Sequence, residues 1–255
     1  MSEKIKSINF NGFQKETFLF LRDLTDNNNK EWFQENKTRY QEQLVKPLKE
    51  LMNCLEPYIS LLNNELFTKF KTHVTTMAIN KDMRFVKNTS PYRNYQKVSY
   101  PVNGRKWSND PVLGFGIFPD FFYVASRCEG KSRKEYKDRM QRNFQKYPQV
   151  FERWLYDCKI CENYRLIGGA HDDVKEISEL PDRIVDWKNQ KNLTVGKVWS
   201  SKNEDLYSQE LIKFISKSIA DLYFLKLWAL SDNPEMEYEN YLESREEVWK
   251  LVSLI

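Results

Sequence analysis

Apolar side chains recur at helical spacing through the first quarter of the chain. Residues 13–24 form a short predicted helix, with four apolar side chains on one side: Phe13, Phe20, Leu21 and Leu24. A longer helix follows, because eight further apolar side chains recur at steps of three, four or seven residues: Phe33, Tyr40, Leu44, Leu48, Leu51, Leu55, Tyr58 and Leu62.

The longer helix carries both a start signal and a break signal. Asn28 stands three residues before Glu31, which predicts a capping box in which each side chain bonds the other's free backbone N–H. Pro47 lies within the apolar stripe. It is expected to kink or divide the helix, because proline lacks an N–H donor and clashes with the preceding turn.

From residue 73 onward the pattern becomes that of β-strands. Segments rich in β-branched and aromatic residues predict strands at 73–80, 97–102, 112–118, 120–128, 164–167 and 193–199. The pair Gly114 and Gly116 falls inside one of these segments and predicts a bend or bulge there.

The remaining segments predict helices at 132–147, 148–157 and 181–190, a long helix capped by Ser200 or Ser201 and ending near 230, and a last helix at 237–254. Helices come first, then short strands, then helices with one late strand. This order lacks a regular βα alternation, so we expect an α+β fold with N-terminal helices, a central mostly antiparallel sheet and C-terminal helices. No linker or repeat divides the chain, and we expect one domain over residues 1–255.

Composition excludes several classes of protein. Of the 255 residues, 40% are hydrophobic and 15% aromatic, which excludes an intrinsically disordered chain. The longest apolar runs fall short of the roughly 20 residues that span a bilayer. The first residues contain no apolar stretch typical of a secretory signal, and four cysteines are too few for a disulfide scaffold. We therefore expect a soluble cytoplasmic protein without membrane association.

The net charge of +4 is unevenly distributed. Residues 80–153 contain sixteen basic and seven acidic side chains, a net +9, which leaves −5 for the remainder. Such an asymmetry suits a phosphate-bearing partner or nucleic acid. The alternative is that the basic helix faces are solvated and pair with the acidic segment 232–255.

Three motifs with possible chemistry carry little weight. Cys158 and Cys161 have the spacing of a zinc or redox half-site, but the chain offers no second pair to complete a four-ligand zinc site. The run that begins at His171 is typical of a turn after a glycine pair. His73 lies in a predicted strand, and the sequence offers no histidine suited to act as the general base of Ser-His or Cys-His catalysis. The sequence therefore predicts no metal and no cofactor.

Residues 81–93 are a stronger candidate. In an extended chain Asp82 and Arg84 share one face, where the carboxylate can orient the guanidinium toward an anion. Pro91 fixes a turn that presents the next two side chains. The predicted clamp for a phosphate or carboxylate consists of Arg84, Lys87, Tyr92 and Arg93. The alternative is a structural Asp–Arg pair that pins the end of a strand.

Two blocks of sequence resemble an uncharacterised bacterial and fungal family, domain of unknown function 2461. The first block, residues 27–40, follows Gly12-Phe13 and reads Asn-Asn-Asn-Lys-Glu-Trp-Phe-Gln-Glu-Asn-Lys-Thr-Arg-Tyr. The second block matches the family at Asp82, Arg84, Phe85, Pro91 and Tyr92, has Arg93 at a lysine position, and departs at Lys81, Val86, Asn88 and Thr89. If the family's Asp-Lys pair takes part in an activity, this chain has lost or altered it.

The resemblance covers residues 8–102 and, more loosely, 180–230. It implies an α+β domain of about this length, without an established activity or cofactor. The chain's similarity to the family thus extends over about residues 8–230, and the acidic helix predicted at 237–254 lies beyond it.

Three residues of the first block, Asn28, Trp32 and Asn36, are four apart and line one stripe of the predicted helix. We hypothesise that this stripe faces residues 82–93 and forms one polar groove with them. The alternative is that Asn28 merely caps the helix. The candidate ligand-binding residues are Asn28, Trp32, Asn36, Asp82, Arg84, Lys87, Tyr92 and Arg93.

Three functions remain open at this point. The first is a binding module for an anionic small molecule or nucleic acid. The second is an enzyme acting on a small anionic substrate, with Asp82 as acid or base. That function is weakened because the neighbouring Arg84 lowers the pKa of such a carboxyl group. The third is a structural or partner-binding protein, and the sequence predicts no oligomeric state.

Overall fold

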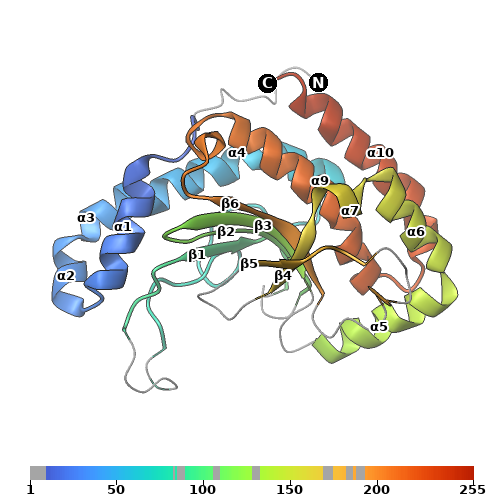
Figure 1. The fold of residues 1–255 in the computed structure, drawn as a ribbon, viewed down its shortest axis with the longest axis horizontal. Helices are drawn as coiled ribbons and strands as arrows, with labels where there is room; N and C mark the ends of the chain where they lie inside the picture. Colours follow the sequence, from blue (N-terminus) through green and yellow to red (C-terminus); the bar gives the residue numbers. More distant parts are fainter. Residues whose placement is uncertain are drawn as a thin grey trace.

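A layer of long helices covers one face of an antiparallel sheet, as Figure 1 shows. The computed structural model describes residues 10–82, 84, 90–105, 110–127, 133–168, 175–181, 186–187 and 193–255. Within these residues the predicted fold class is confirmed: α+β, with N-terminal helices, a central antiparallel sheet and C-terminal helices.

Six strands of the described residues form the sheet, in the order β1-β2-β3-β6-β4-β5, and their pairings are antiparallel. The first three strands make a meander, and β6 returns to lie between β3 and β4. Five strands match predicted segments, whereas β5 has no predicted counterpart. The bounds are β1 Gln96–Ser99, β2 Val112–Ile117, β3 Phe121–Arg127, β4 Arg165–Gly168, β5 Lys175–Ser178 and β6 Thr194–Ser200.

The helices surround the sheet on one side and at its ends (Figure 1). They are α1 Lys15–Asp26, α2 Lys30–Glu35, α3 Lys37–Tyr40, α4 Lys46–Leu62, α5 Arg133–Lys146, α6 Pro148–Asp157, α7 Ile160–Asn163, α9 Glu210–Leu230 and α10 Pro234–Val252. A π-helix, Gln41–Val45, joins α3 to α4, and a 3-10 turn, Glu204–Tyr207, precedes α9. The described part of the chain contains no helix long and apolar enough to span a membrane.

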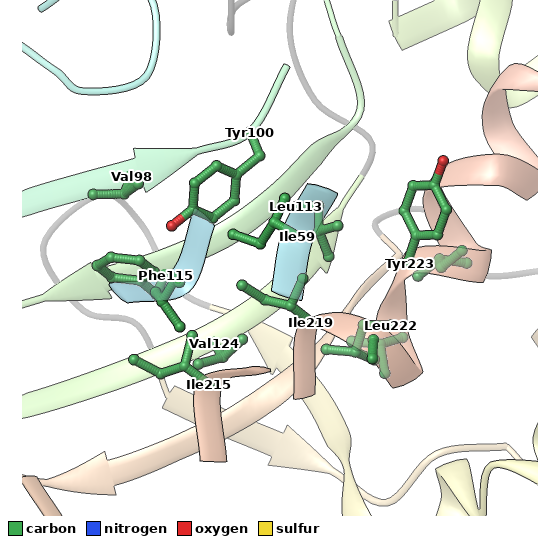
Figure 2. Close-up of a cluster of buried hydrophobic side chains, with 14 of the residues drawn as sticks. Ile59, Val98, Tyr100, Leu113, Phe115, Val124, Ile215, Ile219, Leu222 and Tyr223 are labelled. Carbon is green, nitrogen blue, oxygen red and sulfur yellow. The ribbon is translucent and has the colours of Figure 1, made fainter. Parts of the chain in front are cut away.

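The core lies between the sheet and α9, which packs against β2, β3 and β6. Figure 2 shows Val98, Phe115 and Val124, which are paired across β1, β2 and β3, in one cluster with Ile215 and Ile219 of α9. All five side chains are buried, because one face of each strand meets the apolar surface of the helix. Helices α4 and α10 in turn pack against α9, so α9 is buried on several sides.

The long N-terminal helix is divided, as Pro47 predicts, but the division lies before the proline. The α-helical hydrogen bonding is interrupted at Asn36 and again in the π-helix. There the N–H of Lys46 donates to the carbonyl of Gln41, five residues earlier. Pro47 follows in the first turn of α4, where its missing N–H costs little. The break at Asn36 is not predicted by the apolar spacing.

The predicted strand at 73–80 is wrong. Residues 71–76 form a turn, in which the Thr75 hydroxyl donates to the carbonyl of Lys69 at 2.8 Å and accepts from the N–H of Lys71 at 2.9 Å. His73 adopts a left-handed φ of 66° within this turn. Side-chain hydrogen bonds of threonine to nearby backbone compete with a strand, and here they prevail. In this segment only isolated bridges form: Thr76 pairs with Val98 of β1, and Asn80 pairs with Tyr92 outside the sheet.

Several helix boundaries also differ from the prediction. The first helix begins at Lys15, because the N–H of Phe13 is bonded to the carbonyl of Leu206. Ser201 does not cap the long helix, because its hydroxyl accepts from Arg22 and α9 begins only at Glu210. The helices predicted at 132–147 and 148–157 match α5 and α6, and the last helix begins at Pro234. Most of the helix predicted at 181–190 lies outside the described residues.

Gly114 and Gly116 do not mark a bend or bulge, because β2 keeps a continuous register with β3 through both positions. The ring of Tyr123, which is paired with Gly116 across the strands, lies over the glycine and would overlap an added Cβ. Gly116 therefore allows close packing on the sheet face, whereas a Cβ at Gly114 would overlap the backbone carbonyl of Val98.

Two charged side chains of α9 are buried and partnered. Lys226 and Asp110 form an ion pair in which neither side chain is more than 1% exposed, and Lys226 Nζ also donates to the carbonyl of Pro111 at 2.6 Å. Asp221 accepts from Arg245 Nε of α10 at 2.6 Å and from the Tyr164 hydroxyl at 2.8 Å. Both pairs tie α9 to distant segments.

We predict that Lys226→Met lowers the free energy of unfolding by about 1–3 kcal/mol, because the buried Asp110 carboxylate loses its buried partner and keeps only Arg105 and the N–H of Val102. Urea-induced unfolding measures the change. As a control, Lys213→Met removes a lysine that pairs with Glu210 near the surface of the same helix, and it should cost less than about 1 kcal/mol. Equal losses in the two variants would contradict the prediction.

Candidate functional site

The structure brings Asn28 and Tyr92 together. The Asn28 amide donates to the Tyr92 carbonyl and accepts from the Tyr92 N–H, both at 3.0 Å. The ring of Phe33 stacks on that of Tyr92 with centroids 4.0 Å apart. Asn28 is not the helix cap. Asn29 caps α2 instead, by accepting from the N–H of Trp32 at 2.9 Å.

The other two residues of the predicted stripe are engaged within the N-terminal helices. The half-buried ring of Trp32 stacks on Phe20 at a centroid distance of 6.0 Å. The Asn36 amide donates to the carbonyl of Trp32 at 2.9 Å, where the helix is interrupted. The ring contact packs α2 against α1, and the Asn36 hydrogen bond stabilises the turn between α2 and α3.

Asp82 and Arg84 form the predicted pair on the surface. Arg84 Nε and Nη2 donate to the two carboxylate oxygens at 2.9 and 2.7 Å, and 81% of the Arg84 side chain is exposed. These hydrogen bonds lower the pKa of Asp82 to about 2. A carboxyl group with such a pKa stays ionised at neutral pH and is a poor general acid. Lys87 lies outside the described residues.

The remaining members of the predicted clamp serve the local fold. Tyr92 is buried against Phe33. Arg93 Nη1 donates to the carbonyls of Ala78 at 2.8 Å and Asn80 at 2.5 Å. These bonds hold the segment before β1 in place, so the described cations of residues 81–93 do not converge on one anion.

A cleft of about 340 Å³ lies beside this segment, between the π-helix with the start of α4 and the chain that leads into β1. We call it the Gln96 cleft. Its described lining residues are Tyr40, Gln41, Val45, Leu48, Lys49, Phe70, Thr72, Met77, Ala78, Ile79, Asn80 and Gln96. The carbonyls that Arg93 holds belong to two of these residues, so the predicted segment supports one wall of the cleft.

Gln96 is the most distinctive residue of the cleft. It is 4% exposed, and within the described residues its carbonyl oxygen Oε1 has no hydrogen-bond partner. Burial raises the pKa of the nearby Tyr40 hydroxyl, and the Gln96 side chain opposes this effect. Leaving Oε1 unsatisfied costs about 1–3 kcal/mol.

The charge of the cleft is positive. Lys49 lines it, with Nζ 5.3 Å from the centroid of the Phe70 ring, and no Asp or Glu is among the described lining residues. Sequence reasoning missed this site. A single glutamine at the start of a strand gives no signal, and the π-helix that forms the opposite wall is not visible in the apolar spacing.

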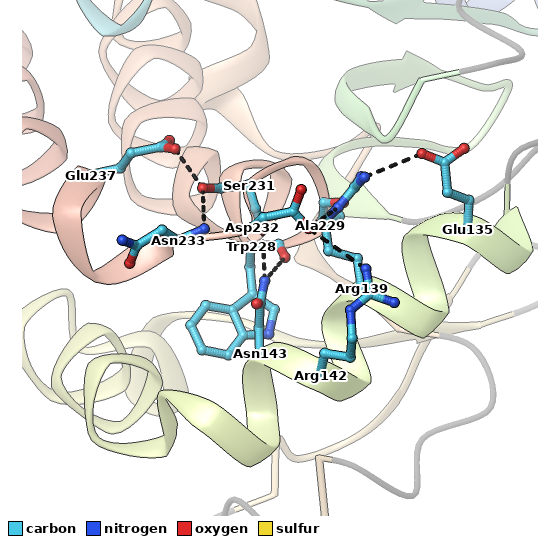
Figure 3. A network of polar contacts seen from close by, with 10 residues as sticks. All are labelled: Glu135, Arg139, Arg142, Asn143, Trp228, Ala229, Ser231, Asp232, Asn233 and Glu237. Carbon is cyan, nitrogen blue, oxygen red and sulfur yellow. Dashed lines mark hydrogen bonds and ion pairs between the residues drawn. The ribbon is translucent and has the colours of Figure 1, made fainter.

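Three arginines of the basic stretch pair with the acidic C-terminal segment. Figure 3 shows Arg139 and Arg142 of α5 around Asp232, with Arg139 Nε 2.9 Å and Arg142 Nη2 3.6 Å from Oδ1. Arg153 of α6 donates to Glu239 of α10 at 2.9 Å. These contacts support the alternative interpretation of the charge asymmetry.

The cysteine pair does not have the properties of a redox site. Burial raises the pKa of the Cys158 thiol to about 12, so the reactive thiolate is scarce at neutral pH. Its sulfur lies 3.2 Å from the Tyr241 hydroxyl. Among the described residues no group of three His, Cys, Asp or Glu is arranged to hold a metal ion. The motif beginning at His171 lies outside the described residues.

The fold and the cleft define an α+β protein with a small polar site beside the edge strand of its sheet. The chain belongs to the family described as conserved hypothetical protein DUF2461, whose model matches residues 16–228. That match includes both sides of the Gln96 cleft and ends before α10 begins. A comparison with curated proteins gives no match.

We predict that Asn28→Ala lowers the free energy of unfolding by about 1–3 kcal/mol, because both backbone groups of Tyr92 lose a partner. Chemical denaturation measures the change. Asn27→Ala is the matched control, since Asn27 is exposed and donates only to a helix carbonyl, and we expect an effect within about 0.5 kcal/mol. A loss no larger than that of the control would show that the Asn28 contacts are unimportant.

We predict that the Asp82 carboxyl titrates near a pKa of 2, and that Arg84→Gln returns its pKa toward the ordinary value of about 3.9. The pair therefore stabilises the fold above the unfolded-state pKa, and this contribution is lost as the pH falls toward 2. Carboxyl carbon NMR gives the titration curve. The pKa of Asp232, which Arg139 lowers, should not respond to the substitution. An unchanged Asp82 curve in the variant would refute the pairing.

Proposed function

We propose that this protein is a binding module whose ligand is a small neutral or anionic molecule held in the Gln96 cleft. The observation that carries the proposal is the cleft itself, whose described lining combines apolar side chains with Lys49, Gln96 and no carboxylate. Buried polar groups in folded proteins nearly always have a hydrogen-bond partner. The buried carbonyl oxygen of Gln96 has none among the described residues, which distinguishes this wall of the cleft.

The size and the walls of the cleft support the same function. Its volume of about 340 Å³ lies at the lower end of the range of small-molecule sites, about 300–1,000 Å³. Its lining combines apolar side chains with a few polar groups, as such sites do. One wall is a π-helix, an irregularity that is frequent at functional sites.

The charges favour a small molecule over nucleic acid. The arginines at 139, 142 and 153 are in ion pairs with the acidic C-terminal segment, which reduces their availability for phosphates. The cleft itself carries Lys49 and no described carboxylate, so it suits a neutral or anionic ligand. An enzymatic function centred on Asp82 is less well supported, because the low pKa of that residue is unsuited to proton transfer.

We predict that Ala78→Phe abolishes ligand binding, because the added ring fills the cleft while the backbone carbonyl that holds Arg93 is retained. The measurement is saturation-transfer NMR with a mixture of neutral, anionic and cationic aromatic fragments. Neutral and anionic fragments should bind to the wild type and to the control Leu19→Phe, which adds a ring on the exposed face of α1.

Circular dichroism verifies the fold of each variant. If Ala78→Phe does not fold, Thr72→Trp at the exposed rim of the cleft replaces it. The absence of any bound fragment in the wild type, or equal binding in the filled variants, would overturn the proposal.

A further inference from the structure

The Gln96 cleft has a small cavity beside it. This second space, of about 20 Å³, is lined by residues of β1, β2 and β3, among them Lys97 and Ala125. Each of these two is next in the chain to a valine that packs with α9, Val98 or Val124 (Figure 2). Successive strand residues point to opposite faces, so Lys97 and Ala125 lie on the face of the sheet away from α9. We call this space the sheet cavity. It holds about one water molecule and is too small for an organic group.

Met77 lines both spaces, and of the described lining residues it alone does so. Residues 75–76 before it line the sheet cavity, and residues 78–80 after it line the Gln96 cleft. The same change of side occurs in β1, where Gln96 lines the cleft and the next residue, Lys97, lines the sheet cavity. The two spaces therefore adjoin at Met77.

The backbone on both sides of Met77 is held in place. Thr76 forms a bridge with β1, and the carbonyl of Ala78 accepts from Arg93 Nη1 at 2.8 Å. The Met77 side chain is half-buried and packs against the apolar cluster that contains Tyr123, a residue of the sheet cavity. Methionine is unbranched and fills irregular spaces. Its side chain can therefore be shortened while the segment keeps its attachments.

We infer that Met77 determines the length of the ligand that the Gln96 cleft accepts. Its side chain separates the cleft from the sheet cavity, and a shorter side chain joins the two spaces into one longer site. This inference rests on the proposed function and names the residue that sets the size of its ligand. Lys49, Lys97 and Arg127 line the two spaces and no described carboxylate does, so anionic probes suit a measurement of length.

The straight-chain carboxylates from butanoate to dodecanoate serve as a ruler. In the wild type, isothermal titration calorimetry should show binding that tightens about fourfold for each methylene until the cleft is filled, and no further. Met77→Ala removes the side chain beyond Cβ, so the tightening should continue through longer chains. The best acid for this variant should then bind about tenfold more tightly than the best acid for the wild type.

Two variants control for other effects of the substitution. Met77→Leu keeps about the same side-chain volume, so the preferred chain length should stay that of the wild type. Met236→Ala removes the same atoms from an exposed methionine that lines neither space, and it should also leave the preference unchanged. If circular dichroism shows that Met77→Ala does not fold, Met77→Val replaces it and should shift the preference in the same direction by less.

A second measurement does not depend on the ligand. Apolar voids bind xenon, so crystals of Met77→Ala under xenon pressure should hold xenon in the space that the methionine side chain vacates. That space should connect the Gln96 cleft with the sheet cavity. Crystals of Met77→Leu should show no xenon at this position and two separate spaces.

The outcomes separate this inference from the proposed function. If carboxylates bind the wild type and Met77→Ala prefers the same chain length, or if the two spaces stay divided in its crystal structure, Met77 does not set the length and the cleft remains a binding site. The same holds if the aromatic fragments bind and carboxylates of no length do. If neither the carboxylates nor the fragments bind, both proposals fail.

Discussion

The rest of the structure depends on the burial of α9. This helix lies between the sheet on one side and α4 and α10 on the other, and fifteen of its 21 residues are buried. A helix that is apolar around its circumference is stable in water only when other elements enclose it. The sheet, the N-terminal helices and the C-terminal helix therefore need α9 as a common surface. The few charges that α9 carries inside this environment have to be neutralised by its neighbours.

Those charges explain how distant segments are attached. Lys226 reaches the chain between β1 and β2, and Asp221 reaches Arg245 of α10 and Tyr164 before β4. Burial raises the pKa of Asp221, and the charge of Arg245 opposes this effect. Buried ion pairs add little net stability compared with apolar residues, but a missing partner is costly. The buried ion pairs therefore favour the one arrangement of the segments in which every charge has its partner. The Arg245–Asp221 pair attaches α10 to the part of the chain that matches the family.

Sequence patterns predicted those features that depend on local spacing. The apolar stripe that ends at Leu62, the helices α5 and α6, and the antiparallel sheet all follow from periodicity and turn residues. Features that depend on competition between partners were not predictable. The turn around Thr75 replaces a strand through hydrogen bonds to its own backbone, and Asn29 rather than Asn28 caps α2 because Asn28 bonds a distant residue. For the same reason the site was predicted only in part. The approach of Asn28 to Tyr92 was anticipated, but the burial of Gln96 arises from tertiary packing.

The π-helix at Gln41–Val45 has a consequence for the cleft. A π turn contains one residue more than the α turn it replaces, and each residue of an α-helix turns the chain by about 100°. The surplus residue therefore sets the angular position of Tyr40 relative to α4. Tyr40 precedes the π-helix, Leu48 and Lys49 follow it, and all three line the cleft. The alignment of these side chains along one wall thus depends on a single inserted residue, which the deletion of one codon would remove.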